Sequence, residues 1–273
     1  SSSTGDVLMA KPGTYLETID FGSRAVVLKA AAPAGPGVTV IDGGGSGPVV
    51  LFQAGETRAT VLEGFSVTGG SGSGGQAGGI AVSSASPTVR GCWIEGNTSG
   101  SFGGGASTRN GANPLFLDCL FEGNHSGSNG GGLFVDNGSV ELARCRFIGN
   151  TAADSGGGMS ARNGAQGDVC RCLFADNACF SSDGGGVFLD GVPLAIRNCE
   201  FNSNSSGALG GGAFVRNANA TPTFDECSFE GNSSGTHGGA LAFDAASVVL
   251  RDSVLNQNTA GLRGGGRRWR RAH

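Results

Sequence analysis

Residues 119–150 read CLFEGNHSGSNGGGLFVDNGSVELARCRFIGN, and the pattern Cys-x-Phe-x-x-Asn both opens and closes this stretch. The same unit recurs seven times at a period of 26 to 28 residues, and a Gly triplet or its near equivalent follows most of its Asn residues. The Asn position is occupied by Asn97, Asn124, Asn150, Asn177, Asn204, Asn232 and Asn258. Fixed columns at a fixed period indicate stacked identical units, as in solenoid proteins.

Each unit is built from short strands rather than helices. A unit is too short for a pair of helices and shows no apolar stripe of helical period, whereas Ser139-Val140-Glu141-Leu142 alternates with a period of two. We therefore expect an all-β fold, a single-stranded parallel β-helix of about ten coils, each of 26–28 residues. Stacking at ~4.8 Å predicts a rod about 50 Å long. The 53 Gly residues suit the corners, where a Cβ would be forbidden.

One elongated body is expected to occupy most of the chain. We predict irregular N-terminal coils over 1–75, regular repeats over 76–263 and a basic irregular tail over 264–273. The net charge is −4, but five Arg lie in the last eleven residues, so the rest of the chain has 13 basic and 22 acidic residues. A body with a net charge of −9 argues against nucleic-acid binding. No apolar run approaches the roughly 20 residues that span a bilayer.

Four or five columns are predicted to face inward, and they include the first and third positions after each Gly triplet, for example Leu241 and Phe243. The Cys column holds Cys92, Cys119, Cys145, Cys172, Cys199, Cys227 and, as its one substitution, Ser253. We interpret these six cysteines as small apolar core residues with free thiols; Cys170 and Cys179 lie off the column and are the better candidates for a disulfide. Stacked Asn side chains at a corner can hydrogen-bond from coil to coil. The three His are scattered, and no metal or other cofactor is expected.

Two outward columns follow each Gly triplet. The fourth position reads Ser83, Arg109, Asp136, Arg162, Asp190, Arg216 and Asp244. Stacked at ~4.8 Å, each charge would meet an opposite one above and below, which favours a role in register, with a ligand site as the alternative. The second position includes Phe134, Phe188 and Phe214, which predict either an exposed contact surface or rings covered by neighbouring loops.

Asp136 and Asp190 also raise the question of catalysis. They lie two coils apart, roughly 9–10 Å, near the upper end of the separation used by inverting glycoside hydrolases. However, the interleaved Arg109, Arg162 and Arg216 should hold both carboxylates ionised and so remove the general acid.

The repeats resemble those of the chlamydial polymorphic outer membrane proteins. The resemblance is carried by Phe-Glu-Gly-Asn (121–124 and 229–232), Phe-Ile-Gly-Asn (147–150) and Phe-Ala-Asp-Asn (174–177), together with Gly-Gly-Gly-Leu and Gly-Gly-Ala-Leu. The segment over 5–17 is similar to the first coil of many pectin-lyase-like β-helix proteins. The two resemblances imply a right-handed coil, an extracellular or cell-surface location, and a role in adhesion.

We therefore expect an extracellular or cell-surface module with a structural or adhesive role and no catalytic activity. It would bind a glycan or a cell-surface protein, or associate with itself into filaments through open coil ends. The alternative is a polysaccharide lyase or glycoside hydrolase of the pectin-lyase-like type, because the same fold hosts such enzymes.

Overall fold

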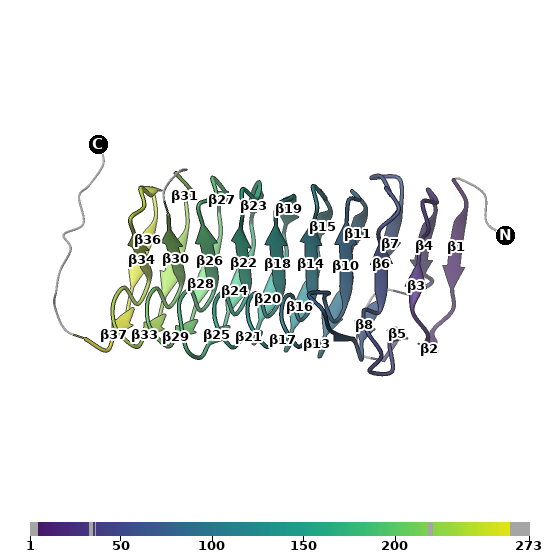
Figure 1. The fold of residues 1–273 in the computed structure, drawn as a ribbon, viewed down its shortest axis with the longest axis horizontal. Helices are drawn as coiled ribbons and strands as arrows, with labels where there is room; N and C mark the ends of the chain where they lie inside the picture. Colours follow the sequence, from purple (N-terminus) through teal and green to yellow (C-terminus); the bar gives the residue numbers. More distant parts are fainter. Residues whose placement is uncertain (1–4, 33–34, 36, 218–220, 263–273) are drawn as a thin grey trace.

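The computed structural model describes residues 5–32, 35, 37–217 and 221–262. Within these residues the chain forms strands and turns and no helix, and it winds into an elongated rod with β1 and β37 near opposite ends (Figure 1). The predicted parallel β-helix is confirmed. The basic tail predicted over 264–273 lies outside the described residues. None of the described residues forms a helix with the length and hydropathy needed to cross a membrane.

Each regular coil contributes one strand to each of four sheets, in the order C, A, B and D. Sheet A contains β1 (Val7–Ala10), β4 (Val27–Ala30), β7 (Val61–Glu63), β11 (Thr88–Arg90), β15 (Leu115–Leu117), β19 (Ser139–Ala143), β23 (Gln166–Cys170), β27 (Ala195–Arg197), β31 (Thr223–Asp225) and β35 (Val249–Arg251). Sheet B contains β2 (Gly13–Leu16), β5 (Thr39–Asp42), β8 (Ser66–Thr68), β12 (Trp93–Glu95), β16 (Leu120–Glu122), β20 (Arg146–Ile148), β24 (Leu173–Ala175), β28 (Glu200–Asn202), β32 (Ser228–Glu230) and β36 (Val254–Asn256).

The other two sheets complete each coil. Sheet C contains β3 (Ile19–Asp20), β6 (Val50–Phe52), β10 (Ile80–Ser83), β14 (Ala106–Arg109), β18 (Leu133–Asp136), β22 (Met159–Arg162), β26 (Val187–Asp190), β30 (Ala213–Arg216) and β34 (Leu241–Asp244). Sheet D contains β9 (Ser71–Gly72), β13 (Thr98–Ser99), β17 (His125–Ser126), β21 (Thr151–Ala152), β25 (Ala178–Cys179), β29 (Ser205–Ser206), β33 (Ser233–Ser234) and β37 (Thr259–Ala260). Neighbouring strands are parallel, so the same position of each repeat forms a column along the rod.

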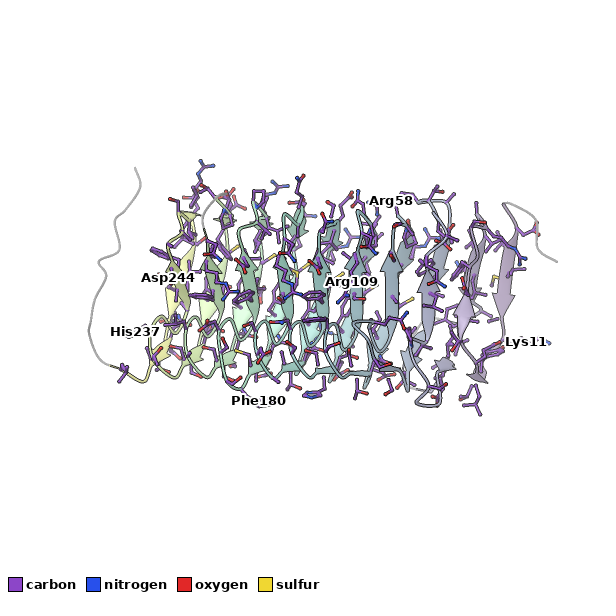
Figure 2. All side chains as sticks on the ribbon, in the orientation of Figure 1. Lys11, Arg58, Arg109, Phe180, His237 and Asp244 are labelled. Carbon is purple, nitrogen blue, oxygen red and sulfur yellow. The ribbon has the colours of Figure 1, made fainter. Side chains whose placement is uncertain are left out.

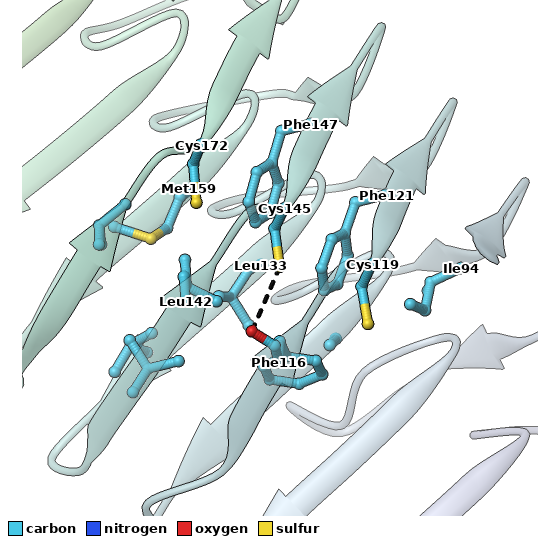
Figure 3. Packing of buried hydrophobic residues seen from close by; sticks show 14 of the residues in the cluster. Ile94, Phe116, Cys119, Phe121, Leu133, Leu142, Cys145, Phe147, Met159 and Cys172 are labelled. Atoms are coloured by element: carbon cyan, nitrogen blue, oxygen red, sulfur yellow. Dashed lines mark hydrogen bonds between the residues drawn. The ribbon is translucent and has the colours of Figure 1, made fainter. Parts of the chain in front are cut away.

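The core consists of stacked columns of the kind the repeat predicts. Phe121 and Phe147 have ring centroids 4.5 Å apart and nearly parallel planes, and both rings are fully buried. Beside them the Cys145 thiol donates to the Phe116 carbonyl oxygen at 3.4 Å (Figure 3). The prediction of a buried Phe243 is wrong: its side chain is 42% exposed, because β34 is the last strand of sheet C and has a neighbour on one side only.

The Asn column forms a continuous ladder at one corner. Asn150 Nδ2 donates to Asn177 Oδ1 at 2.9 Å and to the Phe121 carbonyl at 2.9 Å, and the Asn150 backbone N–H donates to the same Asn177 oxygen at 3.0 Å. Asn150 and Asn177 are fully buried. Each Asn side-chain amide therefore forms hydrogen bonds with backbone groups of a neighbouring coil. This confirms the predicted asparagine ladder.

Candidate functional site

The outer face of sheet C carries the charged column predicted from the sequence. Figure 2 shows Arg109 and Asp244 on this face, in strands β14 and β34. Successive strands align Ser83 with Arg109, Arg109 with Asp136, Asp136 with Arg162, Asp190 with Arg216, and Arg216 with Asp244. The alternation of charge along the rod follows directly from this register.

Two opposite-charge pairs form within the described part of this column. Arg216 donates from Nε and Nη2 to Asp190 at 3.0 and 2.8 Å, and Asn217 donates to the other oxygen of that carboxylate at 2.6 Å. Arg162 Nη2 lies 3.8 Å from Asp136. Partial burial raises the pKa of Asp190, but the hydrogen bonds from Arg216 and Asn217 and the charge of Arg216 outweigh it, so the pKa stays below its ordinary value.

The second column is not an exposed apolar surface. Phe134, Phe188 and Phe214 are 0%, 3% and 2% exposed, although they lie outside the main core cluster that holds their neighbours Leu133 and Val135. The rings leave sheet C on its outer side and are covered there by other segments. The expectation that these three residues form an exposed contact surface is therefore wrong, and the alternative, rings covered by neighbouring segments, is confirmed.

The cover consists of the turn that leads into each strand of sheet C. In the turns before β14, β18, β22, β26, β30 and β34 the first Gly has a φ between 65° and 70°; these glycines are Gly103, Gly130, Gly156, Gly184, Gly210 and Gly238. A Cβ on Gly130 would lie 2.5 Å from the Leu133 carbonyl oxygen and 2.9 Å from the Phe134 Cα. Phe102, from the preceding turn, stacks on Phe134 with ring centroids 4.7 Å apart. Gly at this position therefore lets the turn lie directly against the outer column.

All three arginines of the column lie beside aromatic rings, and Arg109 differs from the other two in its hydrogen bonds. Its guanidinium carbon lies 5.1 Å from the ring centroids of both Phe102 and Phe134, while that of Arg162 lies 4.7 Å from the same two centroids and that of Arg216 lies 5.0 Å from the Phe188 centroid. Within the described part of the chain, its Nε and Nη2 are buried and have no hydrogen-bond acceptor. Burial lowers the pKa of Arg109, and the neighbouring charge of Asp136 only partly opposes this.

A hollow of about 210 Å³ lies beside Arg109 on the same face. The small residues Ala81 and Ser107 line it, where the corresponding residue of the next strand is Phe134. A Cβ on Gly75 would lie 2.8 Å from Arg109 Nη1, so the glycine leaves room for the guanidinium. The remaining lining residues are Leu51, Gln53, Gly74, Gln76, Val82, Ser83 and Asn110.

The two carboxylates are held as hydrogen-bond acceptors. Asp136 accepts from Asn163 Nδ2 at 2.5 Å and faces Arg162, and Asp190 accepts from Arg216 and Asn217. The donors to Asp190 stabilise its ionised form, so this side chain is not arranged to deliver a proton to a leaving group. The described residues also hold no group of three or more His, Cys, Asp or Glu that could bind a metal ion.

The cysteines belong to the core rather than to this face. All six members of the Cys column are buried free thiols, as the sequence predicts. Burial raises the pKa of Cys92 to about 12. Cys170 and Cys179 are also free, so the disulfide that the sequence left open between them is not formed.

The sequence analysis missed two residues of this face, Phe102 and Gly75. Both lie in the turn before a strand of sheet C, in segments whose coil-to-coil sequence varies. The available signal was the single Phe directly before the glycines of 103–105, at a position where the other turns carry Gln76, Asn129, Ser155, Asp183, Leu209 or His237.

Comparison with known proteins agrees with the architecture. A family model described as a right-handed β-helix region matches residues 125–267, more than half of the chain. The chain belongs to this right-handed β-helix family. The match establishes the handedness that the sequence resemblance implied. A search of curated protein sequences found no match.

Solved structures of similar fold include an enzyme and an adhesin. The pectate lyase Pel9A is 14% identical, with a TM-score of 0.48, over 93% of this chain and 70% of that one. PfbA, a surface protein and adhesin of Streptococcus pneumoniae, is 9% identical with a TM-score of 0.31, over 94% of this chain and 90% of that one. A second PfbA structure is 10% identical with a TM-score of 0.30, over 94% of this chain and 84% of that one. At these levels of identity the likeness concerns the fold and not the activity.

Proposed function

We propose that this β-helix is a non-catalytic binding module of the cell surface or the extracellular space, and that it contacts a glycan with the outer face of sheet C. The observation that carries the proposal is the hollow beside Arg109, which combines space, polar side chains and guanidinium N–H groups that no described residue accepts from. The extracellular setting is supported by the likeness of the repeats to chlamydial surface proteins.

The size and lining of the hollow support a sugar ligand. Its volume of about 210 Å³ is below the roughly 300–1,000 Å³ of pockets that enclose a whole small ligand. It therefore suits one unit of a longer chain, with the remainder lying along the rod. Gln53, Ser83, Ser107 and Asn110 offer amide and hydroxyl groups of the kind that pair with sugar hydroxyls.

Binding is favoured over cleavage by the state of the carboxylates. A glycoside hydrolase needs one protonated carboxyl group and one ionised one. In this column Asp190 is held ionised by Arg216 and Asn217, and Asp136 accepts a hydrogen bond from Asn163 and lies 3.8 Å from Arg162. The face is therefore suited to hydrogen bonding rather than to proton transfer.

The test is a glycan-array screen combined with a variant that fills the hollow. Ser107→Phe places in β14 the side chain that β18 carries at the same position as Phe134, so it should close the hollow and leave the coil folded. Ala242→Phe, in the same column of β34, is the matched control away from the hollow. We expect binding by the unmodified chain and by the control, and loss of binding in Ser107→Phe.

Two outcomes would contradict the proposal. If Ser107→Phe binds glycans as well as the unmodified chain, the ligand does not use this face. If product analysis in the same wells, with and without calcium, detects cleaved polymer, the module is an enzyme and the lyase or hydrolase alternative replaces the proposal.

A further inference from the structure

The three arginines of the charged column contact their surroundings in three different ways. Arg216 donates from Nε and Nη2 to one carboxylate, at 3.0 and 2.8 Å. Arg162 has a 3.8 Å ion pair with Asp136 and lies 4.7 Å from the ring centroids of Phe102 and Phe134, and its Nε finds no acceptor among the described residues. Arg109 goes further, because its Nε and its Nη2 both lack an acceptor in the described structure. The number of buried guanidinium nitrogens without an acceptor therefore rises from Arg216 through Arg162 to Arg109, which has two.

The position of Arg109 in the column explains this difference. The neighbour on one side is Ser83, which brings no charge. The neighbour on the other side is Asp136, whose carboxylate already accepts from Asn163 at 2.5 Å and faces Arg162. The charges on this face therefore leave Arg109 without a carboxylate of its own.

Nε and Nη2 are shielded from solvent, so a ligand in the hollow reaches the guanidinium through Nη1, which lies next to Gly75 and has no acceptor among the described residues. A buried polar N–H without a partner costs about 1–3 kcal/mol, and more when the group is charged. The guanidinium is nevertheless held in place, because it lies at 5.1 Å from both stacked rings of Phe102 and Phe134. The Nη1 side of the guanidinium, which lies toward Gly75 and the hollow, is left to pair with an acceptor.

The hollow next to Arg109 favours a negatively charged acceptor. Arg109 is the one charged side chain among the eleven residues that line it, all of them described. A carboxylate, phosphate or sulfate group matches a guanidinium fork with two parallel hydrogen bonds, which a neutral hydroxyl does not. Such a group would accept from Nη1 and neutralise the charge of Arg109 at once.

We propose that Arg109 is an oxyanion-binding residue, which anchors a carboxylate, phosphate or sulfate group of the ligand in the hollow lined by Ala81, Ser83 and Ser107. This inference rests on the proposed function in that it names the chemical group recognised at the same hollow. It assigns the specificity of the face to one side chain, and the rest of the column, including Arg216, stays engaged in stacking.

The experiment uses small anions on the full chain, independently of any glycan. Sodium sulfate, sodium phosphate and sodium acetate are titrated against sodium chloride at constant ionic strength. The arginine side-chain Nε–H resonances are followed by NMR and the affinity by calorimetry. We expect at least one oxyanion to shift the Arg109 resonance at millimolar concentration. The anion that binds most tightly shows whether the site prefers a planar carboxylate or a tetrahedral phosphate or sulfate.

Variants make the assignment specific. Arg109→Gln should abolish the binding of that anion, and Arg109→Lys should weaken it at least about tenfold because the fork is lost while the charge is kept. Ser107→Phe should block it with Arg109 intact. Arg216→Gln is the matched control, because Arg216 is already engaged with Asp190, and should bind as the unmodified chain does.

The result that overturns the inference is an Arg109 resonance that no oxyanion shifts, or an anion affinity equal in Arg109→Gln and the unmodified chain. These outcomes are separate from those of the glycan screen. Glycan binding without any oxyanion effect at Arg109 would reject the anion site and keep the binding module. Oxyanion binding at Arg109 without glycan binding would support the site and reject the glycan.

Discussion

The asparagine ladder allows a quantitative prediction for Asn177→Ala. The Asn177 side chain makes four hydrogen bonds: Oδ1 accepts from the Asn150 backbone N–H at 3.0 Å and from Asn150 Nδ2 at 2.9 Å, and Nδ2 donates to the Phe147 carbonyl and to Asn204 Oδ1, both at 2.9 Å. Removing it leaves the buried Asn150 N–H without its acceptor, at about 1–3 kcal/mol. The other three bonds contribute about 0.5–1.5 kcal/mol each. We therefore expect a loss of about 2.5–7.5 kcal/mol in the free energy of unfolding.

Asn258→Ala is the matched control for this prediction. Asn258 also makes four bonds, to Asn232, Phe229 and Asn256, at 2.8–2.9 Å, but it is only partly buried. Water can replace its bonds, so we expect less than half the loss seen for Asn177→Ala. Equilibrium urea unfolding followed by circular dichroism measures both, and hydrogen exchange at the Asn150 amide should accelerate in Asn177→Ala. Equal losses in the two variants would refute the argument that burial sets the cost.

Three further predictions concern the outer face of sheet C. Phe188→Ala should cost about 3–5 kcal/mol in urea unfolding, because the ring is 3% exposed; a loss near zero would mean that the covering turn is open in solution. Gly130→Ala should cost at least about 1–2 kcal/mol from its positive φ alone and more from the contact with Leu133, measured as a fall in the urea midpoint; an unchanged midpoint would reject the close approach of the turn. The folded-state pKa of Asp190 lies below 3.8, so its contribution to stability is complete above that pH and is lost as the pH falls through the folded pKa. The stability advantage of the unmodified chain over Asp190→Asn should therefore be constant above about pH 5 and shrink below about pH 4, and an advantage that grows on acidification would contradict the assignment.

The stacking partners of the core could be predicted because they depend on position within the repeat alone. In a parallel stack, residue n of one coil meets residue n of the next, so a column of Asn or Phe in the sequence becomes a ladder in space. The bonds from Asn150 to Asn177 and the stacking of Phe121 on Phe147 follow from this, and so does the alignment of Arg109 with Asp136. The resemblance of the repeats to known families supplied the handedness.

The outer face of sheet C could be predicted only in part. A period of two correctly places Phe134 and Phe188 on the side of the strand that faces away from the core, but it does not say whether another segment lies above them. That depends on the path of the turn, which the glycines at 130 and 184 allow to lie against the strand. Burial of these rings is therefore a property of the turn and not of the strand pattern.

The sequence by itself determined the architecture, because period, alternation and column identity are local and repeat in every coil. Only the tertiary structure decided which charges find partners. Arg109, Arg162 and Arg216 occupy equivalent positions of the repeat, yet Arg216 donates to Asp190, whereas Nε and Nη2 of Arg109 have no acceptor among the described residues and the side chain lies beside a hollow. This difference arises from the residues one coil away on either side, and such contacts between coils do not follow from the repeat pattern alone.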